Sequence, residues 1–131
     1  MENKKLKILL VDDDRFLLDM YTLKFNKSDI EVDAVPSSTA SLEKLRAGAV
    51  YDILIFDIIM PTMDGLELLK IIRTEKLVPD SVVIMLTNQT DDLEKAKSLG
   101  VDGYIVKATT IPSEVVEQVI TIYNNKKNKV Q

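Results

Sequence analysis

Short apolar runs alternate along the chain with segments in which apolar and polar residues are mixed. Five of these runs are rich in β-branched residues: Leu6–Val11, Ile30–Val35, Ile53–Phe56, Val82–Leu86 and Tyr104–Val106. The first, third and fourth runs are almost continuously apolar and do not alternate with period two, which is typical of strands buried on both faces. The pattern therefore predicts five strands.

Apolar residues recur at helical spacing in the segment that follows each run. The predicted helices cover 15–27, a segment that starts at the potential capping residues Ser37–Thr39, a segment after Gly65, the segment Leu93–Leu99, and a segment after Pro112. Gly100 stands where a helix commonly ends in a left-handed residue. Strand and helix thus alternate five times.

Strict alternation of strands and helices predicts a parallel sheet with helices on both faces and right-handed crossovers. Five strands fit the flavodoxin-like, doubly wound α/β fold, (βα)5, with strand order 2-1-3-4-5. In this fold a ligand site lies at the carboxyl ends of the strands, beside the point where the strand order reverses. We expect one domain over residues 1–124 and a polar, fraying tail over residues 125–131.

The composition excludes several kinds of chemistry. The 131 residues include no histidine and no cysteine. Disulfides, thiolate zinc sites, cysteine nucleophiles, imidazole bases and Ser-His-Asp arrangements are therefore ruled out. Any catalysis must therefore depend on carboxylates, lysine, hydroxyls or a hard metal ion.

Charge and hydropathy narrow the range of partners. The net charge of −4 disfavours direct binding to nucleic acid phosphates. No apolar run approaches the length of about 20 residues that a membrane span needs. The segment Met1–Lys5 leads into the first strand without a cleavage site, so we expect no signal peptide and a cytoplasmic location.

Polar side chains follow four of the predicted strands. They are Asp12, Asp13 and Asp14 after the first strand, Asp57 after the third, Thr87 after the fourth and Lys107 after the fifth. Because these strands are neighbours in the predicted order, the side chains should converge on one cleft. Crowded carboxylates repel one another unless a cation is present, and oxygen ligands favour Mg²⁺ or Mn²⁺.

Each of these residues also has a purely structural explanation. Asp14 can cap the following helix, Asp57 can simply end a strand, Thr87 can cap a turn, and Lys107 can be a solvated surface lysine. Their joint occurrence at four adjacent strand ends is difficult to explain by structure alone.

Four segments together resemble the receiver domain of two-component response regulators, such as the chemotaxis receivers. They are Ile8–Asp14, Asp57–Gly65 with the pattern D-x-x-M-P-x-M-D-G, Leu86–Thr87 and Gly103–Lys107. The resemblance covers about residues 5–124.

The resemblance implies that Asp57 accepts a phosphoryl group from the phosphohistidine of a sensor histidine kinase or phosphotransfer protein. Asp12, Asp13, Asp57 and the backbone carbonyl of Ile59 would hold Mg²⁺. A carboxylate is already a nucleophile, so the absence of histidine does not prevent this reaction. Beyond self-phosphorylation and autodephosphorylation, the protein would not be an enzyme.

The resemblance also implies a switch. Thr87 and Lys107 would contact the phosphoryl group, and Tyr104 would turn inward when Thr87 moves. The face formed by the fourth helix, fifth strand and fifth helix would then regulate a downstream protein or an output domain. The molecule would be a monomer or a homodimer promoted by phosphorylation, with no direct contact to nucleic acid or membrane.

Three features depart from the family pattern. Ala108 follows the lysine where most members have a proline with a cis peptide bond, and the sequence leaves the Lys107–Ala108 geometry open. Asn88 stands where a small residue is usual and is expected to narrow the phosphate pocket. Ile59 and Gln89 occupy positions that bias autodephosphorylation.

Three other functions compete with this interpretation. A haloacid-dehalogenase-type phosphatase requires D-x-D-x-[TV], which Asp12–Phe16 does not match. A flavodoxin-like redox protein would need a loop that binds phosphate after the first strand, where acidic residues would repel FMN. A degenerate receiver that serves only for docking is disfavoured because the acidic pair, Asp57, Thr87 and Lys107 are all present.

Overall fold

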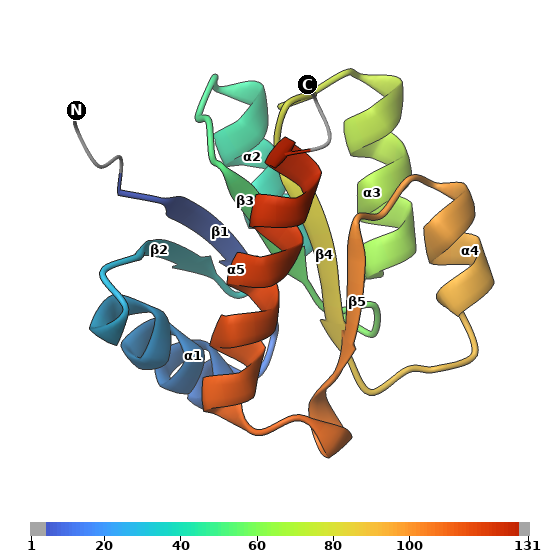
Figure 1. The fold of residues 1–131 in the computed structure, drawn as a ribbon. Helices are drawn as coiled ribbons and strands as arrows, with labels where there is room; N and C mark the ends of the chain where they lie inside the picture. The colour runs from blue at the N-terminus through green and yellow to red at the C-terminus, as the bar shows by residue number, and fades with distance from the viewer. Residues whose placement is uncertain (1–4, 129–131) are drawn as a thin grey trace.

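A five-stranded parallel sheet forms the centre of the molecule in the computed structural model, which describes residues 5–128 (Figure 1). The strands are β1 (Lys7–Val11), β2 (Glu31–Val35), β3 (Ile53–Phe56), β4 (Val82–Thr87) and β5 (Gly103–Val106). Their order is β2-β1-β3-β4-β5, which confirms the predicted doubly wound fold. The strand order reverses between β1 and β3, because the chain passes from β1 to β2 on one side and continues with β3 on the other.

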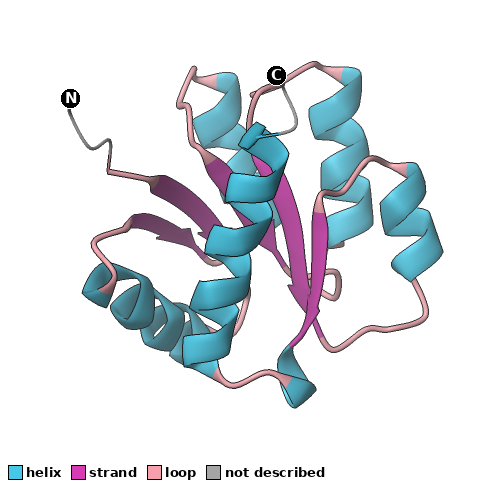
Figure 2. Cartoon of the chain, in the orientation of Figure 1, coloured by secondary structure: helices cyan, strands magenta, loops and turns pink. Residues whose placement is uncertain are grey.

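The helices, drawn in cyan in Figure 2, begin close to the residues that the sequence indicated. They are α1 (Arg15–Lys27), α2 (Ser38–Arg46), α3 (Gly65–Thr74), α4 (Leu93–Ser98) and α5 (Pro112–Asn128), with a 3-10 turn, η1 (Lys107–Thr109), before α5. The Ser37 side chain caps α2 by accepting from the Ala40 N–H at 3.1 Å, and Gly100 follows α4 with φ of 82°. In the described part of the chain, no helix has both the length and the apolar character of a membrane span.

The last helix extends further than expected from the sequence. We placed residues 125–131 in a polar tail, but α5 continues to Asn128. Lys126 Nζ lies 2.9 Å from Asp102 Oδ1, and Lys127 Nζ donates to the Asp80 carbonyl at 3.1 Å. These contacts hold the last turn against loops that are distant in sequence. Residues 129–131 lie outside the described residues.

Two apolar clusters, one on each face of the sheet, make up the core. One face packs against α1 and α5, with Ile8, Ile55 and Ile84 in contact with residues such as Phe25 and Val119. The other face packs against α2, α3 and α4. There Leu9, Leu54, Phe56, Val83 and Met85 contact residues such as Leu45, Leu68 and Ala96.

Successive residues of a strand point to opposite faces, so a strand covered by helices on both sides must be apolar throughout. The residues Ile8–Val11, Ile53–Phe56 and Val82–Thr87 are all buried, as predicted for the continuous apolar runs. At the sheet edge, β2 is only partly buried. The rigid centre therefore fixes where the ends of β1, β3 and β4 lie.

Candidate functional site

The carboxyl ends of β1, β3, β4 and β5 meet in a cleft with a volume of about 430 Å³. Its lining includes Asp12, Asp13, Asp57, Thr87, Asn88 and Lys107. The parallel register accounts for this convergence, since Val11 pairs with Phe56, Phe56 with Met85, and Thr87 with Val106. The residues that follow these pairs must emerge at the same edge of the sheet.

Lys107 forms the electrostatic centre of the cleft. Its Nζ lies 2.6 Å from Asp12 Oδ2 and 2.9 Å from Asp57 Oδ2. The Lys107, Asp12 and Asp57 side chains are only 9%, 5% and 11% exposed. Burial disfavours the ammonium, but the hydrogen bonds to the two carboxylates outweigh it and raise the pKa of Lys107. This lysine is therefore not a solvated surface residue.

Asp12 shows the cost of gathering acidic groups at this edge. Burial raises the pKa of the Asp12 carboxyl above its ordinary value, and the nearby Asp57 adds to the effect. The contacts with Lys107 and with the Asp14 N–H, at 2.9 Å, offset this shift only in part. A further cation beside these carboxylates would relieve the remaining repulsion.

Three carboxylates are close enough to share a metal ion. One oxygen each from Asp12, Asp13 and Asp57 lies within 4.8 Å of the other two. Asp12 and Asp57 are buried, whereas Asp13 is exposed. Oxygen donors of this kind suit a hard divalent ion. The cluster is thus compatible with a divalent metal, as the sequence predicted.

Asp14, in contrast, has the structural role that the sequence left open. Its Oδ1 accepts hydrogen bonds from the Phe16 and Leu17 N–H groups at 3.0 and 3.2 Å, and so caps α1. The third aspartate of the run therefore belongs to the helix start and not to the acidic cluster.

Thr87 and Tyr104 are joined through the loop that follows β4. The fully buried Thr87 accepts a hydrogen bond on Oγ1 from the Gln89 N–H at 3.1 Å. The Tyr104 hydroxyl donates to the Gln89 carbonyl. Burial, together with the charges of Asp92, Asp57 and Asp91, raises the pKa of this phenol, which stays protonated as a donor.

Asn88 makes a contact that the sequence reasoning missed. It lines the cleft as expected, but its Oδ1 also accepts a hydrogen bond from the Ala108 N–H at 2.7 Å. The Lys107–Ala108 peptide bond is trans, since residues 5–128 contain no cis peptide bond. A signal was available in the sequence: a residue other than proline at 108 carries an N–H that needs an acceptor.

Gly65 allows the start of α3 to lie directly against the backbone of Asp57. A Cβ at residue 65 would overlap the Asp57 carbonyl oxygen, and the Gly65 N–H donates to the Ile58 carbonyl at 2.7 Å. The Asp64 side chain caps the helix in a reciprocal capping box with Glu67. Gly65 ends the D-x-x-M-P-x-M-D-G motif, but the sequence alone did not indicate that a side chain at this position would collide with the backbone of Asp57.

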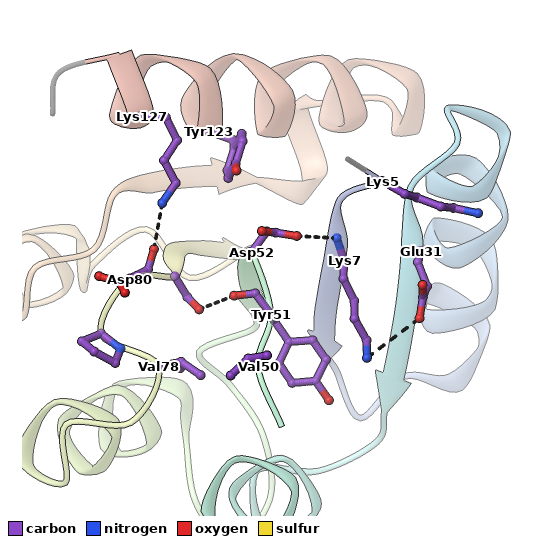
Figure 3. A pocket seen from close by; sticks show the side chains of 12 residues that line it. Lys5, Lys7, Glu31, Val50, Tyr51, Asp52, Val78, Asp80, Tyr123 and Lys127 are labelled. Carbon is purple, nitrogen blue, oxygen red and sulfur yellow. Dashed lines mark hydrogen bonds and ion pairs between the residues drawn. The ribbon is translucent and has the colours of Figure 1, made fainter. Parts of the chain in front are cut away.

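A second cleft, with a volume of about 540 Å³, opens at the opposite edge of the sheet (Figure 3). Lys7 Nζ lies 3.9 Å from Glu31 Oε2 there, and Lys127 donates to the Asp80 carbonyl. The lining contains none of the predicted site residues. The charges around this cleft are mixed in sign and do not converge on one point, so we place the functional site at the carboxyl edge.

Known proteins share both the sequence pattern and the fold. The response regulator receiver domain family matches residues 8–120. The regulatory protein VanRc of Enterococcus gallinarum is 33% identical over 117 residues, which are 88% of this chain and 48% of that protein. The chain spans about half the length of the curated relatives it matches.

Solved structures agree with the fold over nearly the whole chain. A CheY-like receiver domain protein from Methanospirillum hungatei superposes with a TM-score of 0.84 at 28% identity, over 96% of this chain and 99% of the other. The response regulator TrrA of Thermotoga maritima, solved in complex with Mg²⁺ and BeF, superposes with a TM-score of 0.77 at 30% identity, over 91% and 99%. With the fold, the acidic cleft and the family match in agreement, the chain belongs to the receiver domains of two-component response regulators.

Proposed function

We propose that Asp57 is the residue on which this receiver domain accepts a phosphoryl group. The observation that carries the proposal is the position of Lys107 Nζ, between Asp12 and Asp57 and within 2.9 Å of both. Asp57 thereby lies in the cleft with the ammonium of Lys107 beside its Oδ2. The donor would be a phosphohistidine of a sensor histidine kinase or a phosphotransfer protein.

Asp12, Asp13 and Asp57 would hold a divalent ion, which we propose to be Mg²⁺ or Mn²⁺, with the Ile59 carbonyl as a further ligand. The mutual approach of the three carboxylates supports this assignment. When bound, such an ion neutralises negative charge on the transferring group and the acceptor. The related TrrA, solved with Mg²⁺ and BeF, is consistent with this chemistry.

In the transfer itself, a carboxylate oxygen of Asp57 forms a bond to phosphorus while the phosphorus–nitrogen bond of the phosphohistidine breaks. The electron pair of the broken bond stays on the histidine of the partner, so no base of this chain is needed. Lys107 would follow the negative charge from the carboxylate to the phosphoryl oxygens. Its Nζ already contacts Asp12 and Asp57, at 2.6 and 2.9 Å, and therefore lies beside the carboxylate that would receive the phosphoryl group.

The contacts of Thr87 suggest how phosphorylation would be transmitted. The Thr87 hydroxyl is fully buried, so it would have to move to reach a phosphoryl oxygen, and this movement would disturb its hydrogen bond with the Gln89 N–H. The carbonyl of Gln89 also accepts from Tyr104. A change at Thr87 would therefore reach β5 and the neighbouring α4 and α5. We propose that this face regulates a downstream protein or an output domain in the cytoplasm, as a monomer or as a phosphorylation-promoted homodimer.

The test is phosphoryl uptake from acetyl phosphate in the presence of Mg²⁺, followed by intact mass spectrometry. We expect the parent to gain the mass of one phosphoryl group and Asp57→Asn to gain none. Asp80→Asn serves as the control, because Asp80 is an exposed aspartate at the opposite edge of the sheet, and it should behave as the parent. Uptake by Asp57→Asn at the parental rate would contradict the proposal, and no uptake by the parent would favour a docking module.

A further inference from the structure

The hydrogen-bonded ladder between β4 and β5 ends one residue before Lys107. Its last pair is Thr87 with Val106, and Lys107 then begins the η1 turn. The side chain of Lys107 must nevertheless stay between Asp12 and Asp57. Beyond the ladder, the Thr110 N–H donates to the Lys107 carbonyl at 3.3 Å and closes the η1 turn, but this bond does not connect the turn to another part of the site.

The Asn88 side chain provides that connection. Its amide lies 2.7 Å from the Ala108 N–H and links the loop after β4 to the loop after β5. Since a backbone N–H can only donate, the atom facing it must be the carbonyl oxygen of the Asn88 amide. Lys107 is thus held by the sheet through Val106 on one side and by Asn88 through Ala108 on the other.

The same contact joins the two groups that face the phosphoryl position. Asn88 directly follows Thr87, and Ala108 directly follows Lys107. A hydrogen bond between Asn88 and Ala108 therefore keeps the backbone at Thr87 in register with the backbone at Lys107. The contact requires an N–H at residue 108, which a proline could not supply.

We propose that Asn88 is a positioning residue for phosphoryl uptake, acting through the Ala108 N–H to align Lys107 with Thr87. This inference rests on the proposed function of Asp57. It assigns to Asn88 and Ala108 together the alignment of the cationic and hydroxyl groups at the site, a role that neither residue could fill alone.

The first experiment compares Asn88→Ala with Thr90→Ala, an exposed substitution in the same loop. The initial rate of uptake from acetyl phosphate, at saturating Mg²⁺, should fall about fivefold in Asn88→Ala, the effect of one lost hydrogen bond of this kind. Thr90→Ala should keep the parental rate. Amide hydrogen exchange at Ala108 should speed up in Asn88→Ala only, which reports the bond itself independently of overall stability.

The second experiment is a double-mutant cycle with Ala108→Pro, which removes the donor. If Asn88 acts through this donor, Asn88→Ala should leave the uptake rate unchanged in the Ala108→Pro background. An equal loss of rate in both backgrounds would mean that Asn88 acts in another way, such as restricting access to the cleft, and the inference would be wrong.

The third experiment does not depend on the proline variant. Asn88→Asp keeps an acceptor for the Ala108 N–H, and about 0.5 M KCl screens its added charge. At this salt concentration Asn88→Asp should take up phosphate faster than Asn88→Ala, and an equal or lower rate would overturn the inference. Failure of the proposed function looks different, because then the parent itself gains no phosphate or Asp57→Asn still does.

Discussion

At the scale of single residues, Lys107 compensates the negative charge of the cleft in the absence of a metal ion. It is the only cationic side chain lining the cleft among the described residues, and it contacts two buried carboxylates at once. Buried ion pairs contribute little net stability, but removing one partner leaves an uncompensated buried charge, which costs several kcal/mol. Lys107 should therefore stabilise the folded state, in addition to the role that we propose for it in phosphoryl uptake.

We expect Lys107→Met to lower the free energy of unfolding in EDTA by about 3 kcal/mol, because Asp12 and Asp57 lose their counter-ion. Saturating Mg²⁺ should recover part of this loss by supplying a replacement cation. Denaturant melts with and without Mg²⁺ measure both effects. The matched control is Lys126→Met, whose half-exposed ion pair with Asp102 should be worth less than about 1 kcal/mol. Similar losses in the two variants would contradict this account.

At the scale of elements, the start of α3 fixes the backbone that carries Asp57. The capping box of Asp64 and Glu67 sets where the helix begins, and the missing side chain of Gly65 lets that helix turn lie on the Asp57 carbonyl. The helix and the candidate acceptor therefore form one packed unit. A displacement of the first turn of α3 should therefore also displace Asp57 in the cleft.

Gly65→Ala should cost about 2 kcal/mol of stability, because the added methyl group would overlap the Asp57 carbonyl and force the two segments apart. The same displacement should slow phosphoryl uptake from acetyl phosphate. Gly48→Ala is the control: its φ of 101° makes the substitution strained, but nothing lies within 4 Å of the new Cβ and the cleft is distant. Gly48→Ala should lose stability and keep the parental uptake rate. A parental uptake rate in Gly65→Ala would show that the packing of α3 against Asp57 does not affect phosphoryl uptake.

Asp33 links three elements through side-chain contacts and gives a prediction for pH. Its Oδ2 lies 2.6 Å from the Tyr51 hydroxyl, which precedes β3, and 3.2 Å from Lys44 Nζ on α2. Burial opposes ionisation, but the hydrogen bonds from Tyr51 and Lys44 prevail and lower the pKa of Asp33. The unfolded chain then binds the proton more tightly, so this stabilisation is present above the ordinary pKa of 3.8 and is lost as pH falls through the lower, folded value.

We therefore expect Asp33→Asn to lose about 1 kcal/mol at neutral pH, the difference between a charged and a neutral hydrogen-bond acceptor. The gap between parent and variant should close as the pH falls below about 4. Urea melts of both proteins over this pH range provide the measurement. A gap that is unchanged at low pH would show that Asp33 acts without its charge.

The elements with the strongest local signals were predicted well. Continuous apolar runs are decisive for β3 and β4 because both faces of these strands are covered by helices. The extent of α5 was not predictable, since Lys126 and Lys127 are held by residues that only the fold brings near. The same holds at the cleft: residue types at strand ends indicate the chemistry, whereas the Asn88 contact with Ala108 depends on where two loops meet.

At the scale of the whole molecule, the acidic cluster exists only in the folded chain. Asp12 and Asp13 follow β1 and Asp57 follows β3, so unfolding separates the carboxylates. A ligand that binds this arrangement and not the unfolded chain stabilises the entire fold by mass action. Stability measurements therefore report on occupancy of the site.

We expect Mg²⁺ with beryllofluoride to stabilise the parent by about 2.7 kcal/mol at a concentration a hundredfold above Kd. Asp13→Asn should lose most of this response, because it removes the exposed carboxylate of the cluster. Without metal the variant should be more stable than the parent by about 1 kcal/mol, since one repelling charge is gone. Denaturant melts in EDTA and in Mg²⁺ with beryllofluoride test both statements. A variant that is less stable in EDTA, or that responds as the parent does, would show that Asp13 is not a ligand.

Helix α5 runs along the strands from their carboxyl ends to their amino ends, so a small tilt at its first turn moves its last turn by a larger distance (Figure 1). Its first residue, Pro112, lies just beyond η1 at the edge with the acidic cleft, whereas Lys127 contacts Asp80 at the opposite edge. Seventeen helical residues span about 25 Å, so a tilt of ~5° about the first turn displaces the far end by ~2 Å. Such a displacement is enough to break the 3.1 Å contact of Lys127 with the Asp80 carbonyl. A small rotation at η1 would thus be amplified into a rearranged surface on the other side of the protein, with the helix itself unchanged.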